Sequence, residues 1–291
     1  MDYTIHTAVS EIREDPLFQG KGHLLFPQWN RMPLSMEIKD LKNLLPWYSE
    51  IHAETSVRVF QDLHDRAAAG ETVIYSFYRP EEIAEDPTRA DTGLVFFRGR
   101  RQAPTAVCCA GGGFMYVGAI HDSFPHGLVL SEMGYNAFCI IYRPEARLAC
   151  IDLSRALVWL FDHAAELEIS MQGYSLWGGS AGARMAAWVG TFGTEAFGYR
   201  PLPRPAAVIM QYTGLSEVTG NEPPTYACVG TADWIANAGV MKKRIETLRK
   251  RGIPAKIEIF PGLSHGFGLG LGTVAEGWID RAAAFWKKVS P

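Results

Sequence analysis

The sequence predicts an α/β fold, with a mostly parallel central sheet and helices on both of its faces. From about residue 93 onward, short apolar runs of β-forming character alternate with longer segments of helical character. Several runs are apolar at consecutive rather than alternate positions, which is typical of strands covered on both faces. Strands that alternate with helices along the chain are the pattern of a parallel sheet.

Seven strands are expected in this region, at residues 92–99, 105–111, 136–143, 173–179, 206–214, 225–231 and 255–262. Helices are expected at residues 151–168, 183–192, 237–252 and 274–289. The helix at 151–168 places Leu153, Leu157 and Leu160 on one face. Gly252 marks the end of the helix at 237–252, because glycine is a common residue just past a helix C-terminus.

The first 90 residues follow a different pattern. Two helical stretches, at residues 35–50 and 54–70, precede a strand at 72–78 and then a polar loop. The chain has no repeat, no low-complexity tract and no linker long enough to separate a second domain. We therefore expect a single domain over residues 1–291, in which residues 1–90 are a helical extension packed on the core, in the manner of a cap.

Composition narrows the classes of function. The chain has 291 residues, of which 47% are hydrophobic and 20% charged, and this is ordinary for a folded soluble protein. Its net charge of -3 gives no electrostatic reason to expect a nucleic-acid partner. The most apolar stretch, residues 105–120, is broken by glycines and too short to span a bilayer, so no membrane span is expected.

The cysteines and the N-terminal residues indicate the cellular compartment that is expected for this protein. The five cysteines show neither zinc-ligand nor C-x-x-C spacing, which favours buried, reduced thiols and predicts no metal site. Residues 1–16 carry acidic side chains and lack an uninterrupted apolar core, so they do not resemble a signal peptide. A cytoplasmic location is the expectation that follows.

Ser180 is the first candidate for chemistry. It matches the pattern G-x-S-x-G at residues 178–182, between an expected strand and an expected helix. A strand that turns directly into a helix strains the serine backbone and leaves no room for side chains two residues away, where Gly178 and Gly182 stand. The turn holds the hydroxyl outward and puts the Ala181 N–H at a helix N-terminus. The alternative is a glycine-rich packing turn, but the strand–helix context favours a nucleophile.

A serine hydroxyl needs a base, and the base needs an acid that orients it. Asp233 and His265 each follow an expected strand, so Ser180, Asp233 and His265 fall in the order Ser…Asp…His at strand ends. Asp233 as a helix N-cap and His265 in a mobile glycine loop are the alternatives. Each explains one residue, whereas a catalytic triad explains all three.

Three successive glycines, at residues 111–113, stand where the expected strand at 105–111 ends. Backbone N–H groups without side chains can approach the negative oxygen that forms during acyl transfer, so Gly112, Gly113 and Ala181 are the expected donors of an oxyanion hole. A nucleotide-binding loop is disfavoured, because neither G-x-G-x-x-G nor the P-loop spacing occurs.

Apolar side chains near these loops could line a small acyl pocket or belong to the core. They are Phe114, Met115, Tyr116, Trp234 and Phe267, of which Phe114, Tyr116 and Trp234 are the candidate substrate contacts. His121 and His126 follow the glycine loop closely and are weaker candidates for the same role.

Together, "AGGGF" (110–114), "GGSAG" (178–182), "GTAD" (230–233) and "SHGF" (264–267) resemble the α/β-hydrolase family. They are most similar to its esterase branch, related to hormone-sensitive lipase and to bacterial acetyl-xylan esterases, and residues 140–169 add to the likeness. The resemblance runs from about residue 93 to the end. It implies an α/β-hydrolase fold, the nucleophile, base and acid named above, and no metal or organic cofactor. The family often has histidine where this chain has Ala110, so a side chain that commonly braces the glycine loop is missing.

The activity that the resemblance implies is carboxylic-ester hydrolysis through an acyl-enzyme intermediate. Small acetyl-like esters, among them an acetylated sugar, are the expected substrates. A serine peptidase or amidase would use the same residues, although residues 1–90 are far too short for the propeller of the family's oligopeptidases. A non-catalytic binding protein on this scaffold would lack a member of the triad, and none is missing.

Overall fold

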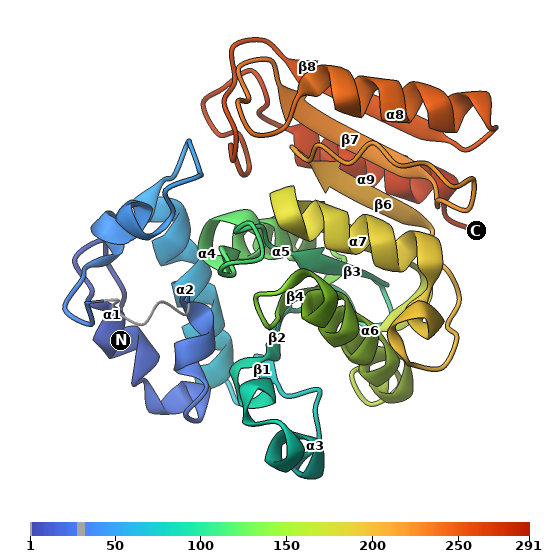
Figure 1. The fold of residues 1–291 in the computed structure, drawn as a ribbon. Helices are drawn as coiled ribbons and strands as arrows, with labels where there is room; N and C mark the ends of the chain where they lie inside the picture. The colour runs from blue at the N-terminus through green and yellow to red at the C-terminus, as the bar shows by residue number, and fades with distance from the viewer. Residues whose placement is uncertain (1, 28–32) are drawn as a thin grey trace.

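The computed structural model describes residues 2–27 and 33–291. It contains one sheet (Figure 1). The strands are β1 (Ile74–Tyr75), β2 (Gly93–Phe97), β3 (Pro104–Cys109), β4 (Asn136–Ile141), β5 (Ser170–Gly179), β6 (Ala207–Gln211), β7 (Thr225–Gly230) and β8 (Ala255–Phe260). They lie side by side in the order β1-β2-β4-β3-β5-β6-β7-β8.

The sheet is parallel except at one edge. β2 pairs antiparallel with both β1 and β4, and every pair from β4 to β8 is parallel. All residues of β2, β4, β6 and β7 are buried. Because both faces of these strands are covered, their sequences are apolar at consecutive positions. The predicted α/β class with a mostly parallel central sheet is confirmed.

The α-helices are α1 (Val9–Arg13), α2 (Ala53–Ala68), α3 (Pro80–Glu85), α4 (Ala119–Asp122), α5 (Phe124–Glu132), α6 (Ala146–His163), α7 (Ser180–Phe192), α8 (Ala238–Lys250) and α9 (Trp278–Val289). Short 3₁₀ helices lie at η1 (Pro16–Phe18), η2 (Gly22–Leu25), η3 (Ile38–Leu44), η4 (Pro87–Asp91) and η5 (Thr194–Phe197). In the view of Figure 1, α6, α7 and α8 cover the near face of the sheet, and α5 and α9 lie behind it.

Two expectations for the N-terminal region are confirmed only in part. The stretch 35–50 holds the 3₁₀ helix η3 and then a turn and an irregular segment, because Pro46 has no N–H for a helix and restricts the residue before it. The strand expected at 72–78 is reduced to β1, Ile74–Tyr75. α5 was not expected either, because its residues are apolar on nearly all sides and show no helical period.

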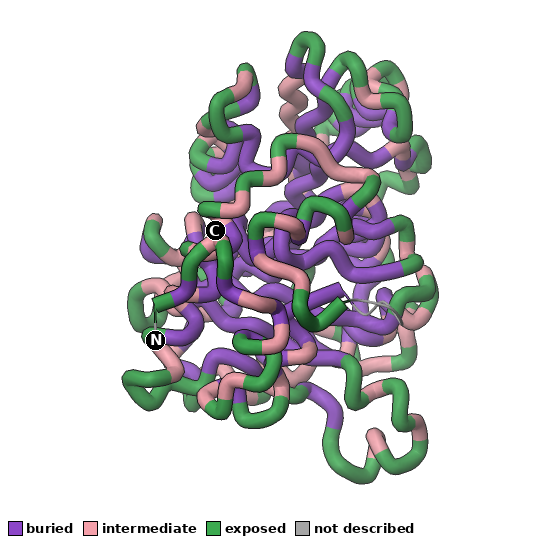
Figure 2. The backbone as a smooth tube through the Cα atoms, turned by 90° about the vertical axis from the view of Figure 1, so that its left-hand side faces the viewer, coloured by how far each residue is buried: buried purple, intermediate pink, exposed green. Residues whose placement is uncertain are grey.

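The N-terminal region shares its buried core with the sheet. Leu41, Phe60 and Leu63 belong to the same hydrophobic cluster as Phe97 and Phe138. α2 packs against α5, so the blue part of the chain in Figure 1 lies beside the helices behind the sheet. Figure 2 shows buried backbone running through the interior of the molecule, with exposed backbone concentrated at the turns. The single-domain organisation of residues 1–291 stays a prediction.

All five cysteines are buried and unpaired. Burial raises the pKa of the Cys109, Cys139 and Cys228 thiols well above its ordinary value. Within residues 2–27 and 33–291, the helices are all too short or too polar to cross a membrane. The cytoplasmic location stays a prediction.

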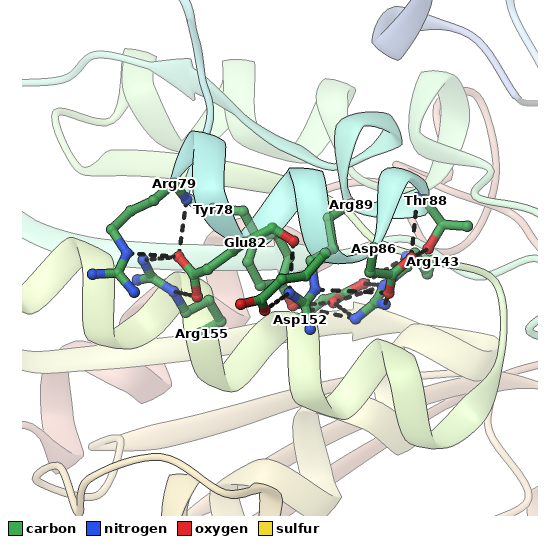
Figure 3. A network of polar contacts seen from close by, with 10 residues as sticks. Tyr78, Arg79, Glu82, Asp86, Thr88, Arg89, Arg143, Asp152 and Arg155 are labelled. Atoms are coloured by element: carbon green, nitrogen blue, oxygen red, sulfur yellow. Dashed lines mark hydrogen bonds and ion pairs between the residues drawn. The ribbon is translucent and has the colours of Figure 1, made fainter.

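A buried ion-pair network holds the chain where β4 ends (Figure 3). The Arg143 guanidinium lies 2.6 Å from Asp152 Oδ1 and 2.6 Å from Asp86 Oδ2. The Asp152 side chain is 0% exposed, and Tyr78 donates a hydrogen bond of 2.5 Å to it. These contacts fix the residue after Tyr142, whose hydroxyl reaches the glycine loop described below.

Candidate active site

Ser180 lies at the point where β5 passes directly into α7. β5 ends at Gly179 and α7 begins at Ser180. The backbone φ of Ser180 is 50°, in the left-handed region that non-glycine residues rarely adopt. The serine therefore has the strained backbone that the sequence pattern predicts for this turn.

Two glycines make this turn possible. A Cβ atom on Gly178 would lie 2.4 Å from the carbonyl carbon of Gly182, and a Cβ atom on Gly182 would lie 2.0 Å from the carbonyl oxygen of Cys109. Both contacts are with backbone atoms, which cannot move aside as a flexible side chain can. Glycine is required at both positions because β3, β5 and α7 meet there without space for a side chain.

His265 lies between Ser180 and Asp233. Its Nε2 is 3.1 Å from Ser180 Oγ, and its Nδ1 is 2.8 Å from Asp233 Oδ2. The side chains of His265 and Asp233 are 2% and 0% exposed. In the chain, Ser180 comes 85 positions before His265, and Asp233 comes 32 positions before it. The ends of β5, β7 and β8 bring the three residues together.

The contacts determine how the imidazole carries its proton. A carboxylate only accepts hydrogen bonds, so the Nδ1–H of His265 donates to Asp233. In the neutral ring Nε2 is then unprotonated, and it accepts the hydroxyl proton of Ser180. This arrangement can draw a proton from a serine hydroxyl as that oxygen attacks a carbonyl carbon.

Asp233 also stabilises its own loop. Its Oδ1 accepts hydrogen bonds from the N–H groups of Ile235 and Ala236, at 2.8 and 2.7 Å. It is not the N-cap of α8, because Asn237 caps that helix with bonds to the N–H groups of Gly239 and Val240. The two oxygens of Asp233 thus have separate functions: one closes the turn and the other faces the imidazole.

The glycine loop after β3 passes alongside Ser180. A Cβ atom on Gly111 would lie 2.8 Å from the Cβ of Ser180. In the described part of the chain, the N–H groups of Gly112 and Gly113 donate to no protein atom. The N–H of Ala181 lies in the first turn of α7, where the helix offers no acceptor. The three expected oxyanion donors are therefore available to an anion.

Residues 47–49 of the N-terminal region are wedged between the glycine loop and the loop of His265. The Trp47 ring stacks on Tyr116, with centroids 5.4 Å apart. A Cβ atom on Gly266 would lie 2.6 Å from Tyr48 Cα, so the His265 loop packs directly on this segment. This contact could not be predicted from the sequence, since no motif marks residues 47–49 and their partners are distant in the chain.

The three candidate substrate contacts are in different environments. Phe114 stacks on Trp188, with an interplanar angle of 10°. Tyr116 is buried and lines a cavity of about 300 Å³ whose wall also includes Tyr142. Trp234 is 75% exposed beside Asp233. Their contact with substrate stays a prediction.

The other aromatic and histidine candidates divide between surface and core. Met115 is 66% exposed, whereas Phe267 is fully buried against Tyr212 and belongs to the core. His121 is buried, its Nε2–H donates a hydrogen bond of 2.8 Å to the Gly266 carbonyl, and burial lowers its pKa to about 4. His126 is buried too, and burial lowers its pKa to about 3. Their burial argues for a structural role for both histidines.

No cluster of three or more His, Cys, Asp or Glu side chains suited to a metal ion occurs in the described ranges.

Comparison with known proteins identifies the fold of this chain. Residues 98–200 match the family model BD-FAE, an α/β-hydrolase domain of the esterase and lipase type. An acetyl ester-xyloside bifunctional hydrolase from Caldicellulosiruptor lactoaceticus superposes with a TM-score of 0.65 at 22% identity, over 74% of this chain and 96% of that one. The chain has an α/β-hydrolase fold. The resemblance predicted from the four sequence motifs is thereby confirmed at the level of the fold.

Other solved structures have a similar fold. Propionate-bound esterase 2 of Thermogutta terrifontis matches with a TM-score of 0.62 at 20% identity, over 74% of this chain and 93% of that one. MGS-M1, an α/β-hydrolase from a Medee basin deep-sea metagenome library, matches with a TM-score of 0.57 at 23% identity, over 68% of this chain and 92% of that one. No curated protein matches the sequence.

Proposed function

We propose that this protein is a serine carboxylic-ester hydrolase that acts on small acyl esters. The observation that carries the proposal is the hydrogen-bonded series from Ser180 Oγ through the His265 imidazole to Asp233, at 3.1 and 2.8 Å. It lies beside backbone N–H groups that donate to no protein atom in the ranges 2–27 and 33–291, and this combination serves acyl transfer. A binding protein has no need for a strained serine held against a buried histidine–carboxylate pair.

In the proposed cycle, His265 takes the Ser180 proton as Oγ attacks the ester carbonyl. The tetrahedral oxyanion accepts hydrogen bonds from the N–H groups of Gly112, Gly113 and Ala181. His265 then gives its proton to the leaving alcohol, and the acyl group stays on Ser180. A water molecule, deprotonated by His265, releases the acid by the same steps. Asp233 stays ionised and holds the imidazole in the required tautomer.

The preference for a small acyl group rests on the relatives. The Thermogutta terrifontis enzyme is described with propionate bound, and the Caldicellulosiruptor lactoaceticus enzyme is described as acting on acetyl esters and xylosides. We propose acetyl-like esters as substrates on this basis, with an acetylated sugar as the natural candidate. No metal or organic cofactor takes part in the proposed cycle.

Hydrolysis of p-nitrophenyl acetate tests the proposal. Wild type should turn over, and Ser180→Ala should lower kcat by about 10⁴-fold or more, because the nucleophile is lost while the oxyanion donors remain. Ser131→Ala is the matched control, since Ser131 lies in α5 and donates only to the Leu128 carbonyl. Equal rates for wild type and Ser180→Ala would overturn the proposal.

Two substrate series define the specificity. Rates should fall from acetate to butyrate to octanoate esters of p-nitrophenol if the acyl site is small. A faster rate on p-nitroacetanilide than on p-nitrophenyl acetate, relative to their uncatalysed rates, would favour an amidase instead. Release of acetate from an acetylated xylo-oligosaccharide, absent in Ser180→Ala, would identify the sugar ester.

A further inference from the structure

A buried carboxyl group lies directly beneath the glycine loop. Asp122 is the last residue of α4, and its side chain is buried. Its Oδ2 accepts a hydrogen bond of 2.7 Å from the Gly111 N–H and one of 3.3 Å from the Tyr48 hydroxyl. Its Oδ1 accepts a short hydrogen bond from the Tyr212 hydroxyl. The carboxyl thus joins the N-terminal segment, the glycine loop and the end of β6.

Asp122 also packs against the residue that precedes the nucleophile. A Cβ atom on Gly179 would lie 2.3 Å from Asp122 Oδ1. A Cβ atom on Gly111 would lie 2.8 Å from both Asp122 Oδ2 and the Cβ of Ser180. The carboxyl is therefore held between the two backbone segments that must keep a fixed separation for an oxyanion to fit between them.

A second contact fixes the other side of the Gly111 peptide. The Tyr142 hydroxyl donates a hydrogen bond of 2.6 Å to the Ala110 carbonyl. The loop that leads to Gly112 and Gly113 is anchored at a carbonyl by Tyr142 and at the next N–H by Asp122. Both anchors come from other parts of the chain, because Ala110 itself has no polar side chain that could hold the loop.

We propose that Asp122 is a positioning residue for the oxyanion hole, which holds the glycine loop at its working distance from Ser180 through the Gly111 N–H. This inference rests on the proposed function, because it assigns a role within the same site. Asp122 touches neither the hydroxyl of Ser180 nor the imidazole nitrogens in the described contacts, so it acts through the loop.

The ionised form of Asp122 suits this role. All three of its partners, the Gly111 N–H and the hydroxyls of Tyr48 and Tyr212, can donate, and a carboxylate accepts from all of them. In a protonated carboxyl, one oxygen would carry the proton and act as a donor, and this would weaken one of these hydrogen bonds. Burial raises the pKa of Asp122 to about 6, against the lowering effect of its hydrogen bonds and of His265.

The surroundings of Asp122 contain few other charges. The titratable groups that face it are the phenols of Tyr48, Tyr116, Tyr142 and Tyr212, the Cys228 thiol and the His265 imidazole. Cys108 and His126 line the same small cavity as Asp122. Burial keeps the pKa of the Tyr48 and Tyr212 phenols well above its ordinary value, so both remain donors. Of these groups, the His265 imidazole is the one that becomes positive during the proposed reaction.

The experiment compares Asp122→Asn with wild type after counting active sites. Paraoxon phosphorylates Thermogutta terrifontis esterase 2, and the p-nitrophenol that it releases here would report the fraction of competent Ser180. Per titrated site, Asp122→Asn should lower kcat by about 10-fold to 100-fold with KM changed less than about twofold, because the oxyanion forms only on the way to the transition state.

Two further variants complete the test. Tyr142→Phe removes the second anchor and should shift kcat rather than KM in the same way, so the loop can be tested even if Asp122→Asn does not fold. Asp280→Asn, at an exposed position in the first turn of α9, should leave kcat, KM and the pH profile unchanged.

The outcomes separate the two proposals. If wild type neither hydrolyses p-nitrophenyl acetate nor reacts with paraoxon, the proposed function fails and the role of Asp122 fails with it. If wild type is active but Asp122→Asn and Tyr142→Phe keep full kcat per titrated site, the positioning role alone is overturned.

Discussion

The Ser49 hydroxyl donates a hydrogen bond of 2.9 Å to the backbone carbonyl of His265. The Ser49 N–H donates a second one, of 3.1 Å, to the carbonyl of Gly266. A segment 216 positions earlier in the chain thus fixes the backbone that carries the candidate base. The imidazole is held from two sides, by Asp233 at its ring and by Ser49 at its main chain.

Ser49→Ala should weaken catalysis without abolishing it. Loss of one hydrogen bond of this kind costs about 1 kcal/mol. If this loss displaces His265 and raises the activation free energy by the same amount, kcat/KM should fall about fivefold. Esterase kinetics and urea unfolding measure the two effects. Ser131→Ala, which also loses a partly buried bond to a carbonyl, should lower stability alone. A fall in kcat/KM of the same size in both variants would contradict the role of Ser49.

Asp233→Asn should preserve the loop and lose the activity. The Asn Oδ1 can still accept from the N–H groups of Ile235 and Ala236, but its amide N–H₂ would face His265 Nδ1 and favour the tautomer with the proton on Nε2. That ring cannot take the Ser180 proton, so we expect kcat to fall by about 10⁴-fold with the melting temperature little changed. Steady-state kinetics and thermal unfolding check this. Activity within tenfold of wild type would exclude Asp233 as the orienting acid.

The stability of the protein should depend on Asp122 between about pH 4 and about pH 6. Burial raises the folded-state pKa from the ordinary 3.8 to about 6, so the folded protein binds more protons than the unfolded chain in this window. Wild type therefore loses stability as the pH rises through it, by on the order of 1 to 3 kcal/mol. Asp122→Asn lacks this ionisation, so its free energy of unfolding relative to wild type should rise from about pH 4 to about pH 6 and then level off. Urea unfolding at several pH values measures it, and a constant difference between the two proteins would refute it.

The ion pair of Arg143 and Asp152 should matter far more than ion pairs at the surface. Asp152→Ala leaves the Arg143 guanidinium buried without its main partner, and such a loss costs about 3 to 5 kcal/mol. Arg101→Ala is the control, because Arg101 is 77% exposed in its pair with Glu168 and should contribute less than about 1 kcal/mol. Chemical unfolding of both variants gives the comparison. Equal costs would show that burial does not strengthen the role of this pair.

The parts of the fold that could be predicted are those that depend on short patterns in the sequence. The buried strands of the parallel sheet follow from runs of apolar residues, and the turn at Ser180 follows from glycines whose spacing reflects a steric requirement. Asp233 and His265 could be proposed because residues after parallel strands meet at one edge of the sheet. The distances among these residues then come from the sheet as a whole.

The parts that could not be predicted depend on contacts between distant segments. Asp122 reads as one acid in a short helix, and its partners at Tyr48, Gly111 and Tyr212 come from three other elements. Trp47 and Tyr48 lie in a stretch whose apolar residues suggested a helix, whereas Pro46 prevents a helix there. Their packing on the glycine loop becomes visible only in three dimensions.

The wedge of residues 47–49 has a practical consequence for anyone who shortens this protein. A truncated version that starts near residue 93, where the likeness to known hydrolases begins, would retain Ser180, Asp233 and His265 in its sequence. It would lack the hydroxyl that tethers the histidine loop and the helix that shields α5 from water. Such a fragment should express poorly or aggregate, so the smallest useful version has to include most of the N-terminal region.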